Sequence, residues 1–194
     1  MSDAFEALGR KLRLGVIGGG PGGMIGPMHR NAARLDGRFA IVAGVPSSDP
    51  ARAAAAGAAI GLPEGRSYGT VATMIDAERA RADGIEAVAI MSPNDAHYPA
   101  AIAAIEAGLD VICDKPMTNT LADARDLAAR VRASGRVFCL THAYAAYPMV
   151  RQARAMVAGG AIGGVRAVQV EYLHAGMATR CLLYTSPSPR DRQK

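Results

Sequence analysis

Residues 12–23 read LRLGVIGGGPGG, a short apolar run that ends in a cluster of glycines. Gly18, Gly20 and Gly23 satisfy the pattern G-x-G-x-x-G. In that order, these glycines permit a tight turn, close approach of the backbone to a pyrophosphate, and close packing of a helix on a strand. The helix that follows supplies N–H groups and a positive dipole end to the anion. The residues expected to line a cofactor site here are Gly18, Gly20, Pro21, Gly22 and Gly23.

Two other nucleotide-binding motifs also contain a glycine-rich turn. A P-loop does not fit, because no Lys-Ser or Lys-Thr pair follows Gly23. A methyltransferase-type G-x-G-x-G also matches, through Gly18, Gly20 and Gly22, but it predicts no chemistry at the fourth strand. A glycine-rich packing turn without a ligand is the remaining alternative.

Outward from this turn, apolar strands alternate with amphipathic helices as far as Leu140. Strands are expected at 12–17, 39–45, 85–91, 109–113 and 136–140, and helices at 24–35, 49–60, 71–81, 95–107 and between Thr120 and Gly135. Such alternation predicts an α/β fold, a Rossmann-type doubly wound parallel sheet covered on both faces. Ligands of these sheets bind beyond the carboxyl ends of the strands. The residues that directly follow each strand are therefore the candidates for chemistry.

The pattern changes after Pro148. Residues 149–158 predict a helix, and residues 165–174 alternate with period two, which predicts a strand of an antiparallel sheet. One strand does not make a domain, so we expect the first elements of a truncated α+β second domain. The expected division is a Rossmann dinucleotide-binding domain at 1–141, the start of a truncated C-terminal α/β substrate domain at 142–177, and a disordered, non-native tail at 178–194.

The tail is set apart by Ser-Pro repeats, which resist both helix and sheet. It resembles a translated adapter or assembly scar, and a natural disordered tail is the alternative. Much of the formal net charge of +5 lies there, and no basic stripe with interleaved aromatic residues runs through the rest. We therefore expect no nucleic-acid partner.

Composition narrows the class of protein further. Half of the 194 residues are hydrophobic and 20% are charged, which indicates a folded chain. The three cysteines lack metal-ligand spacing and fit a reducing compartment. No apolar run approaches the ~20 residues that span a bilayer, and residues 1–14 are not a signal segment. We expect a cytoplasmic protein with no membrane partner and no metal.

The end of the second strand concerns the choice of cofactor. An acidic residue there would hold a ribose 2′-hydroxyl, but none ends this strand. Ser47 and Ser48 stand there instead, with Arg52 one turn on, which favours tolerance of NADP as well as NAD. Asp49 is assigned as the cap of the next helix.

The third strand is followed by SPNDAH at 92–97. Pro93 and Asn94 end the strand and begin a helix at the cofactor edge, where Ser92 is also expected. Asn94 is either the helix cap or a ribose ligand. His97, in the first helical turn, either faces the cofactor or is structural.

The fourth strand runs into Asp114-Lys115-Pro116, and Asp114 and Lys115 are both expected among the cofactor-binding residues. We expect the Lys115 ammonium to be partly desolvated near a carboxylate, and so able to exchange a proton with a substrate hydroxyl. A surface lysine is the alternative, and a cis bond before Pro116 is allowed. After the fifth strand, His142 and Tyr144 either border the nicotinamide or the substrate, or are packed hinge residues.

Taken in order, these segments resemble the Gfo/Idh/MocA oxidoreductases, the family of glucose–fructose oxidoreductase and inositol dehydrogenase. The likeness covers residues 10–175 and is carried by GGGPGG at 18–23, SPNDAH at 92–97, DKP at 114–116 and the stretch from Thr141 to Tyr172. The family usually has Glu-Lys-Pro at the fourth strand. Asp114 departs from this pattern and shortens the reach of the carboxylate.

The resemblance implies an NAD(P)-binding Rossmann domain and a C-terminal domain with a large open sheet. It implies hydride transfer between nicotinamide and a carbinol or carbonyl carbon of a sugar, inositol or related polyol, in a parent protein that is a homo-oligomer. Lys115 matches the family's catalytic lysine. The partner Asp and His lie beyond this chain, and His174 falls too early to be equivalent. We expect the chain alone to bind dinucleotide poorly, to aggregate and to be inactive. A non-catalytic dinucleotide-binding sensor on the same fold is the alternative.

Overall fold

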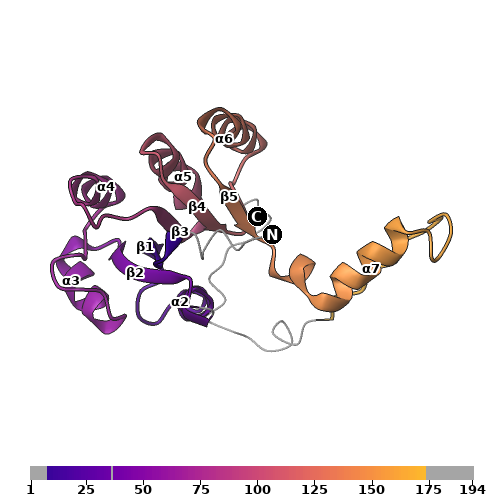
Figure 1. The fold of residues 1–194 in the computed structure, drawn as a ribbon, viewed down its shortest axis with the longest axis horizontal. Coiled ribbons are helices and arrows are strands. Elements are labelled where there is room, and N and C mark those ends of the chain that lie inside the picture. Colours follow the sequence, from indigo (N-terminus) through magenta and orange to yellow (C-terminus); the bar gives the residue numbers. More distant parts are fainter. Residues whose placement is uncertain (1–7, 36, 174–194) are drawn as a thin grey trace, which may run out of the picture. The chain divides into compact units, whose positions relative to one another are not determined.

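Five parallel strands form the sheet of the first of two units into which the chain divides, Met1–Thr141 and His142–Lys194. The computed structural model describes residues 8–35 and 37–173. The strand order is β2-β1-β3-β4-β5 (Figure 1). The elements of this unit are β1 (Leu12–Gly18), α2 (Ile25–Leu35), β2 (Phe39–Val45), α3 (Pro50–Ala59), α4 (Val71–Arg79), β3 (Ala87–Met91), the 3₁₀ helix η1 (Asn94–Ala96), α5 (His97–Glu106), β4 (Asp110–Asp114), α6 (Leu121–Ser134) and β5 (Phe138–Thr141). The predicted doubly wound parallel sheet is confirmed.

Local capping explains where several helices begin and end. Asp49 caps α3, and its Oδ1 accepts a hydrogen bond from the backbone N–H of Ala51 at 3.0 Å. Thr120 caps α6 in the same way, and Gly135 ends that helix with a φ of 66°. Both caps were predicted from the sequence and are confirmed.

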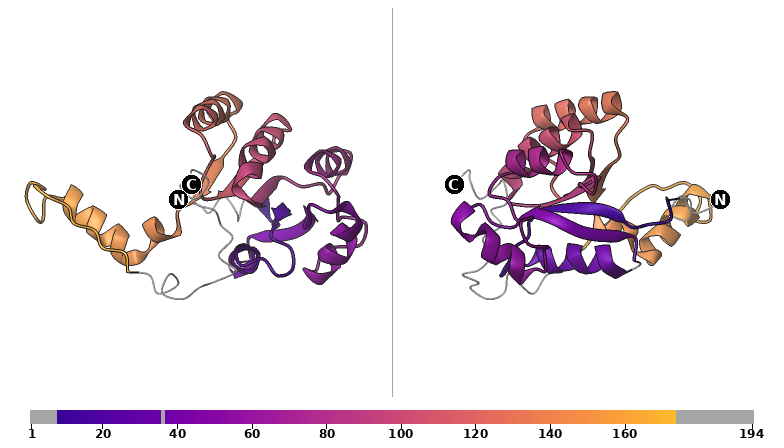
Figure 2. Two further views of the ribbon diagram at one scale, coloured as in Figure 1. Left: turned by 180° about the vertical axis from the view of Figure 1, so that it is seen from behind. Right: turned by 60° about the vertical axis from the view of Figure 1, so that its left-hand side comes forward.

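Helices cover both faces of the sheet, as Figures 1 and 2 show. Side chains alternate between the two faces along each strand, so each face has its own core. Beneath α4, α5 and α6 the core includes Ile17, Val88, Ile90, Val111, Met74, Ala101 and Leu127. The opposite core, next to α2, includes Leu14, Val16, Ala87, Ala89, Ile60 and Leu62. This arrangement leaves the carboxyl ends of the strands for the loops.

A buried ion pair fixes the segment beside the end of β2. The guanidinium of Arg66 donates to the carboxylate of Glu78, which is only 2% exposed, and the Tyr68 hydroxyl donates to the same carboxylate at 2.8 Å. Burial and this hydrogen bond raise the pKa of Tyr68 to about 12. Gly44 in β2 hydrogen-bonds to the backbones of Arg66 and Tyr68. The ion pair therefore ties α4 to the strand end that precedes Ser47.

The second unit is described from His142 to Leu173 and contains the 3₁₀ helix η2 (Ala143–Ala146) and α7 (Pro148–Ala158). Every described residue in it is exposed. The strand predicted from residue 165 is wrong for the described part: residues 165–173 form no strand, because no second strand pairs with them there. His174 and the predicted tail at 178–194 lie outside the described residues.

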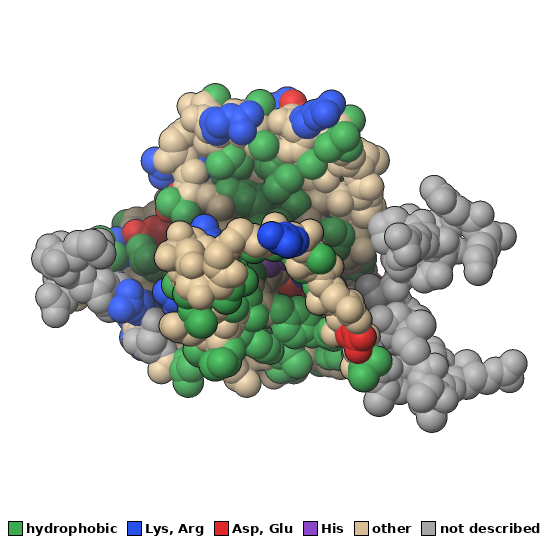
Figure 3. Space-filling view, turned by 90° about the vertical axis from the view of Figure 1, so that its right-hand side faces the viewer, with side chains coloured by type: hydrophobic (Ala, Val, Ile, Leu, Met, Phe, Trp, Pro, Cys, Tyr) green, Lys and Arg blue, Asp and Glu red, His purple; other side chains and the backbone are tan. Residues whose placement is uncertain are grey.

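Hydrophobic side chains are common on the surface of this second unit. Exposed hydrophobic residues appear green in the space-filling view of Figure 3. In the second unit they include Met149, Val150, Val168, Val170 and Leu173. None of the helices formed by the described residues is long and apolar enough to cross a membrane.

Candidate functional site

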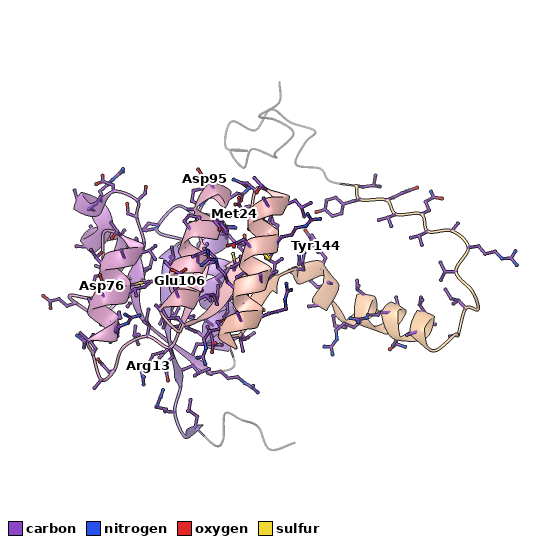
Figure 4. The ribbon with its side chains drawn as sticks, turned by 90° about the horizontal axis from the view of Figure 1, so that it is seen from above. Arg13, Met24, Asp76, Asp95, Glu106 and Tyr144 are labelled. Atoms are coloured by element: carbon purple, nitrogen blue, oxygen red, sulfur yellow. The ribbon has the colours of Figure 1, made fainter. Side chains whose placement is uncertain are left out.

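The carboxyl ends of β1, β3, β4 and β5 lie at one edge of the sheet. Because the strands are parallel, their pairing places Gly18 beside Met91, and Asp114 beside Thr141. Figure 4 shows Met24, after β1, and Asp95, after β3, toward one end of this unit, with Arg13 toward the other. The sequence motifs therefore share the carboxyl edge, where parallel sheets bind their ligands.

The glycine-rich turn lies against two neighbouring segments. A Cβ at Gly20 would overlap the carbonyl oxygen of Pro46, which follows β2. A Cβ at Gly26, in the first turn of α2, would overlap the carbonyl oxygen of Gly19. At Gly23 a Cβ would meet only Gly20 O, at 3.4 Å, which is ordinary contact. The expected close packing of helix and turn therefore depends on Gly26 and not on the third glycine of the motif.

The end of β2 presents two serines and an ion pair. The Ser47 Oγ accepts a hydrogen bond from the Asp49 backbone N–H at 3.1 Å, and the side chain of Ser48 is exposed. Arg52 Nε donates to Asp49 Oδ2 at 2.7 Å. This hydrogen bond and the one from the Ala51 backbone hold the pKa of Asp49 below its ordinary value. Asp49 thus caps α3 and neutralises Arg52. The Ser48 side chain makes no hydrogen bond with the described residues.

Ser92, at the end of β3, has a buried hydroxyl without a partner. Its Oγ makes no hydrogen bond with any of the described residues. Buried hydroxyls are rarely left unpaired, so this one indicates a missing ligand or water. Asn94 is the first residue of η1, and Pro93 occupies the N-cap position of that helix. The proposed role of Asn94 as a ribose ligand stays a prediction.

His97 is buried between two loops of the carboxyl edge. It is 1% exposed, its Nδ1 lies 2.7 Å from the carbonyl oxygen of Pro116, and its Nε2 lies 2.9 Å from that of Ser92. Both ring nitrogens are therefore occupied by backbone. In this geometry His97 joins the loop after β3 to the loop after β4, and its contribution to the cofactor site is to position them.

The carboxylate of Asp114, at the end of β4, is held by three elements. Thr141 Oγ1 at the end of β5 donates to Asp114 Oδ1 at 2.8 Å, and His29 Nε2 of α2 lies 3.7 Å from the same oxygen. Burial alone would raise the pKa of Asp114. The hydrogen bonds from Thr141 and the Lys115 backbone, together with the nearby His29 ring, outweigh burial and bring that pKa to about 2. Asp114 is therefore a stable anion directly before the lysine.

Lys115 differs from the expectation of a desolvated ammonium. Its side chain is exposed, and it forms no ion pair with the described residues. The neighbouring Asp114 carboxylate is engaged by His29 and Thr141 instead. Any desolvation of the ammonium must come from what packs over this edge.

His142 and Tyr144 belong to the second unit. The Tyr144 hydroxyl lies 3.0 Å from that of Tyr172, and its ring packs edge to face on Tyr147 with centroids 5.5 Å apart. His142 and Tyr144 are both exposed. Their predicted role beside nicotinamide or substrate stays a prediction.

Three side chains at this edge were not found from the sequence: His29, Arg30 and Thr141. His29 and Arg30 lie inside α2, whereas the sequence rule points only to residues that directly follow a strand. Arg30 is 9% exposed and donates a hydrogen bond to the Gly19 carbonyl of the glycine-rich turn. The available signal was a helix with basic residues and no acidic residue from Ile25 to Leu35.

A dinucleotide fits this set of residues. The turn approaches Pro46 so closely that only glycine is accommodated at position 20, and the buried Ser92 hydroxyl lacks a partner among the described residues. The first turn of α2 carries no acidic side chain that would oppose a pyrophosphate. The residues that would hold the cofactor are Gly18, Gly20, Pro21, Gly22, Gly23, Ser47, Ser48, Ser92, Pro93 and Asn94.

A cavity of about 440 Å³ lies elsewhere, at the amino ends of the strands. Its lining includes Leu12 at the start of β1, Glu86 before β3 and Asp110 at the start of β4. Because it opens at the opposite edge of the sheet from the glycine-rich turn, it is not part of the candidate site. No group of three or more His, Cys, Asp or Glu side chains within residues 8–35 and 37–173 is placed to hold a metal ion.

Comparison with known proteins gives consistent matches. The sequence model GFO_IDH_MocA, described as "Oxidoreductase family, NAD-binding Rossmann fold", matches residues 12–142. The uncharacterized oxidoreductase YfiI of Bacillus subtilis (strain 168) is 36% identical over 180 residues, which cover 92% of this chain and 46% of that protein. The chain thus spans less than half the length of this curated relative.

Two solved structures are similar to the chain. A crystal structure of an inositol dehydrogenase homolog from Azotobacter vinelandii, complexed with NADH and myo-inositol, has a TM-score of 0.78 and 40% identity, covering 81% of this chain and 41% of that one. A crystal structure of an oxidoreductase from Sinorhizobium meliloti has a TM-score of 0.75 and 48% identity, covering 81% and 44%.

Proposed function

This chain belongs to the Gfo/Idh/MocA oxidoreductase family with an NAD-binding Rossmann fold, and on that premise we propose that the complete protein transfers a hydride between a nicotinamide cofactor and a carbinol or carbonyl carbon of a sugar, inositol or related polyol. Members of this family are oxidoreductases, and this argues against the methyltransferase alternative. The polyol substrate is the part proposed here. It is supported by the inositol dehydrogenase homolog that was crystallised with myo-inositol.

The proposal rests on the position of two turns at the same edge of the sheet. The glycine-rich turn after β1 and the Asp114-Lys115-Pro116 turn after β4 lie at the carboxyl edge of one parallel sheet, with β3 between their strands. The glycine-rich turn would hold the pyrophosphate of the cofactor, and Lys115 would stand at the same edge of the sheet. When bound, NAD supplies the carbon that accepts or donates the hydride.

We assign to Lys115 the exchange of a proton with the substrate hydroxyl at Nζ. Its exposed ammonium is free of ion pairs with the described residues, so it is available to hydrogen-bond a polyol oxygen. Oxidation of an alcohol releases the hydroxyl proton, and a neutral lysine accepts it; reduction runs the same transfer backwards.

Asp114 and His97 support the lysine without touching substrate. The anionic Asp114 is fixed by Thr141 and His29, which sets the direction in which the chain leaves β4. His97 holds the Pro116 carbonyl and thereby fixes the other side of the lysine turn. Ser92 and Asn94 stand at the adjacent strand end, where we propose that they hydrogen-bond the cofactor.

The choice between NAD and NADP depends on the end of β2. The exposed Ser48 leaves room for either a 2′-hydroxyl or a 2′-phosphate, and we propose that NADP is tolerated. The Asp49 carboxylate works against a phosphate, and it is already paired with Arg52. Binding of NAD is a property of the family.

Replacement of the lysine tests the proposed reaction. In the complete protein, Lys115→Ala should lower kcat for oxidation of myo-inositol or another accepted polyol by about a hundredfold or more. The dissociation constant for NAD should change little, because the side chain is not part of the glycine-rich turn. Lys115→Arg is the matched control: it keeps the charge but not the ability to give up a proton near neutral pH, so it should be equally inactive.

Two results would contradict this assignment. A Lys115→Ala enzyme with the wild-type kcat would remove the lysine from the reaction. A wild-type protein that binds NAD but oxidises and reduces no member of a panel of polyols, sugars and their ketones would favour the dinucleotide-binding sensor.

A further inference from the structure

Arg30 is a buried cation directly under the glycine-rich turn. Its side chain is 9% exposed, and it lies one helical turn after Gly26 on the face of α2 that contacts Gly19. The guanidinium donates a hydrogen bond to the Gly19 carbonyl oxygen. It forms no ion pair with any carboxylate of the described residues.

Burial of such a charge is unfavourable unless it is compensated. Burial lowers the pKa of Arg30 from its ordinary value, and the charge of Arg34 on the same helix lowers it further. One carbonyl oxygen satisfies only part of a guanidinium that has five N–H donors. Buried cations in proteins are usually paired with an anion, so an anion at this position is expected.

The charged side chains of α2 are of one sign. Along α2, Arg30 and Arg34 are basic, His29 faces Asp114, and no residue from Ile25 to Leu35 is acidic. The positive end of the α2 dipole lies at the same turn. The carboxylate of Asp114 is engaged by His29 and Thr141, and does not neutralise Arg30.

We infer that Arg30 is a positioning residue of the dinucleotide site, whose buried charge stabilises the pyrophosphate through the glycine-rich turn. Its hydrogen bond keeps the Gly19 carbonyl on the α2 side, so that the oxygen does not face the phosphates and the amides of the turn are left to bind them. Its charge attracts the diphosphate across a medium of low dielectric. This inference rests on the dinucleotide-binding part of the proposed function and not on hydride transfer.

A purely structural role for Arg30 predicts a different result. If the side chain only fills space and fixes Gly19, any variant that retains the hydrogen bond should bind the cofactor normally. If its charge matters, ligands with a diphosphate should lose affinity while uncharged nucleosides should not. The comparison of ADP-ribose with adenosine separates the two, because the latter lacks the phosphates.

The test uses two variants that differ in charge. In the complete protein, Arg30→Gln has a side-chain N–H donor but no charge, whereas Arg30→Lys has both a donor and the charge. We expect Arg30→Gln to weaken ADP-ribose binding by about tenfold and adenosine binding by less than about twofold. Arg30→Lys should stay within about threefold of wild type for ADP-ribose, and Arg34→Gln, which removes an exposed charge from the same helix, should do so as well. Dissociation constants are measured by isothermal titration calorimetry.

Each other outcome overturns the inference. Wild-type affinity of Arg30→Gln for ADP-ribose would show that the charge plays no part. An equal loss for adenosine and ADP-ribose would show that Arg30 is structural, as would a Lys variant as weak as the Gln variant. Absence of ADP-ribose binding by the wild-type protein would overturn the dinucleotide site itself. A lack of polyol turnover would leave these binding constants unaffected, so it would count against the proposed reaction alone.

Discussion

Asp114→Asn should make the protein less stable at neutral pH but not in acid. The pKa of Asp114 is lowered from 3.8 to about 2: burial opposes this change, and the hydrogen bonds from Thr141 and the Lys115 backbone, together with the nearby His29 ring, outweigh burial. A carboxyl group with a lowered pKa stabilises the folded state above its unfolded pKa, and this contribution is lost as the pH falls through the folded pKa. The full contribution is therefore present above about pH 4 and is lost by about pH 2.

The size of the effect follows from the same pKa. Lowering it from 3.8 to about 2 corresponds to about 2 kcal/mol of folding free energy. The side chain is 16% exposed, so solvent screens this contribution only in part. At pH 7 the Asn variant should therefore unfold at a urea concentration lower by roughly 1 M, given the usual dependence of unfolding free energy on urea.

Urea unfolding followed by circular dichroism between pH 2 and pH 7 measures this difference. The Arg10 side chain holds the pKa of Glu86 at about 2 as well, but Glu86 is present in both proteins and cancels in the comparison. Asp95→Asn is the matched control, because Asp95 is an exposed carboxylate at the same edge, and it should change stability little. A stability difference for Asp114→Asn that persists unchanged at pH 2 would refute the charge argument and indicate a packing effect.

Three further substitutions test the fold and the turn. Glu78→Ala leaves Arg66 buried without its main carboxylate and should lower the unfolding free energy by about 3–5 kcal/mol in urea titrations; a loss below about 1 kcal/mol would mean that the pair is solvated. Gly20→Ala places a Cβ on the Pro46 carbonyl oxygen and should weaken NAD binding by about tenfold or more in calorimetric titrations; unchanged affinity would show that the turn shifts freely. Thr120→Ala removes the cap of α6 and should cost about 1 kcal/mol in thermal unfolding, whereas Thr120→Ser should not; equal stability of both would contradict the cap.

The elements of the first unit were predictable because each is specified locally. Strands β1 and β3, in the middle of the sheet, are buried on both faces, so they read as short apolar runs. The ends of all five predicted strands agree with the structure within a few residues. Asp49 and Thr120 mark helix starts through side-chain geometry that needs no tertiary contact. The glycine-rich turn and the position of Lys115 followed from the rule that parallel strands present their carboxyl ends together.

What the sequence did not reveal depends on contacts between distant segments. His29 and Asp114 are 85 positions apart in the numbering and meet only because α2 packs on the sheet against β2 and β3, and β4 is the next strand after β3. The exposure of Lys115 is set by how the chain leaves β4, and no local pattern encodes it. The strand expected from residue 165 failed for a related reason: alternating side chains show that a segment suits a sheet, but a strand forms only where another one pairs with it.

The double contact of the His97 ring has a consequence for building chimeric enzymes. One ring nitrogen contacts the carbonyl oxygen of Ser92 and the other contacts that of Pro116, so a single imidazole joins the two loops. Transplanting either loop alone from a relative would leave half of that ring facing a foreign backbone. Exchanging the whole stretch from Ser92 to Pro116 would transfer both carbonyl acceptors together with the His97 ring. Residues 92–116 are therefore the segment to exchange as one unit between relatives.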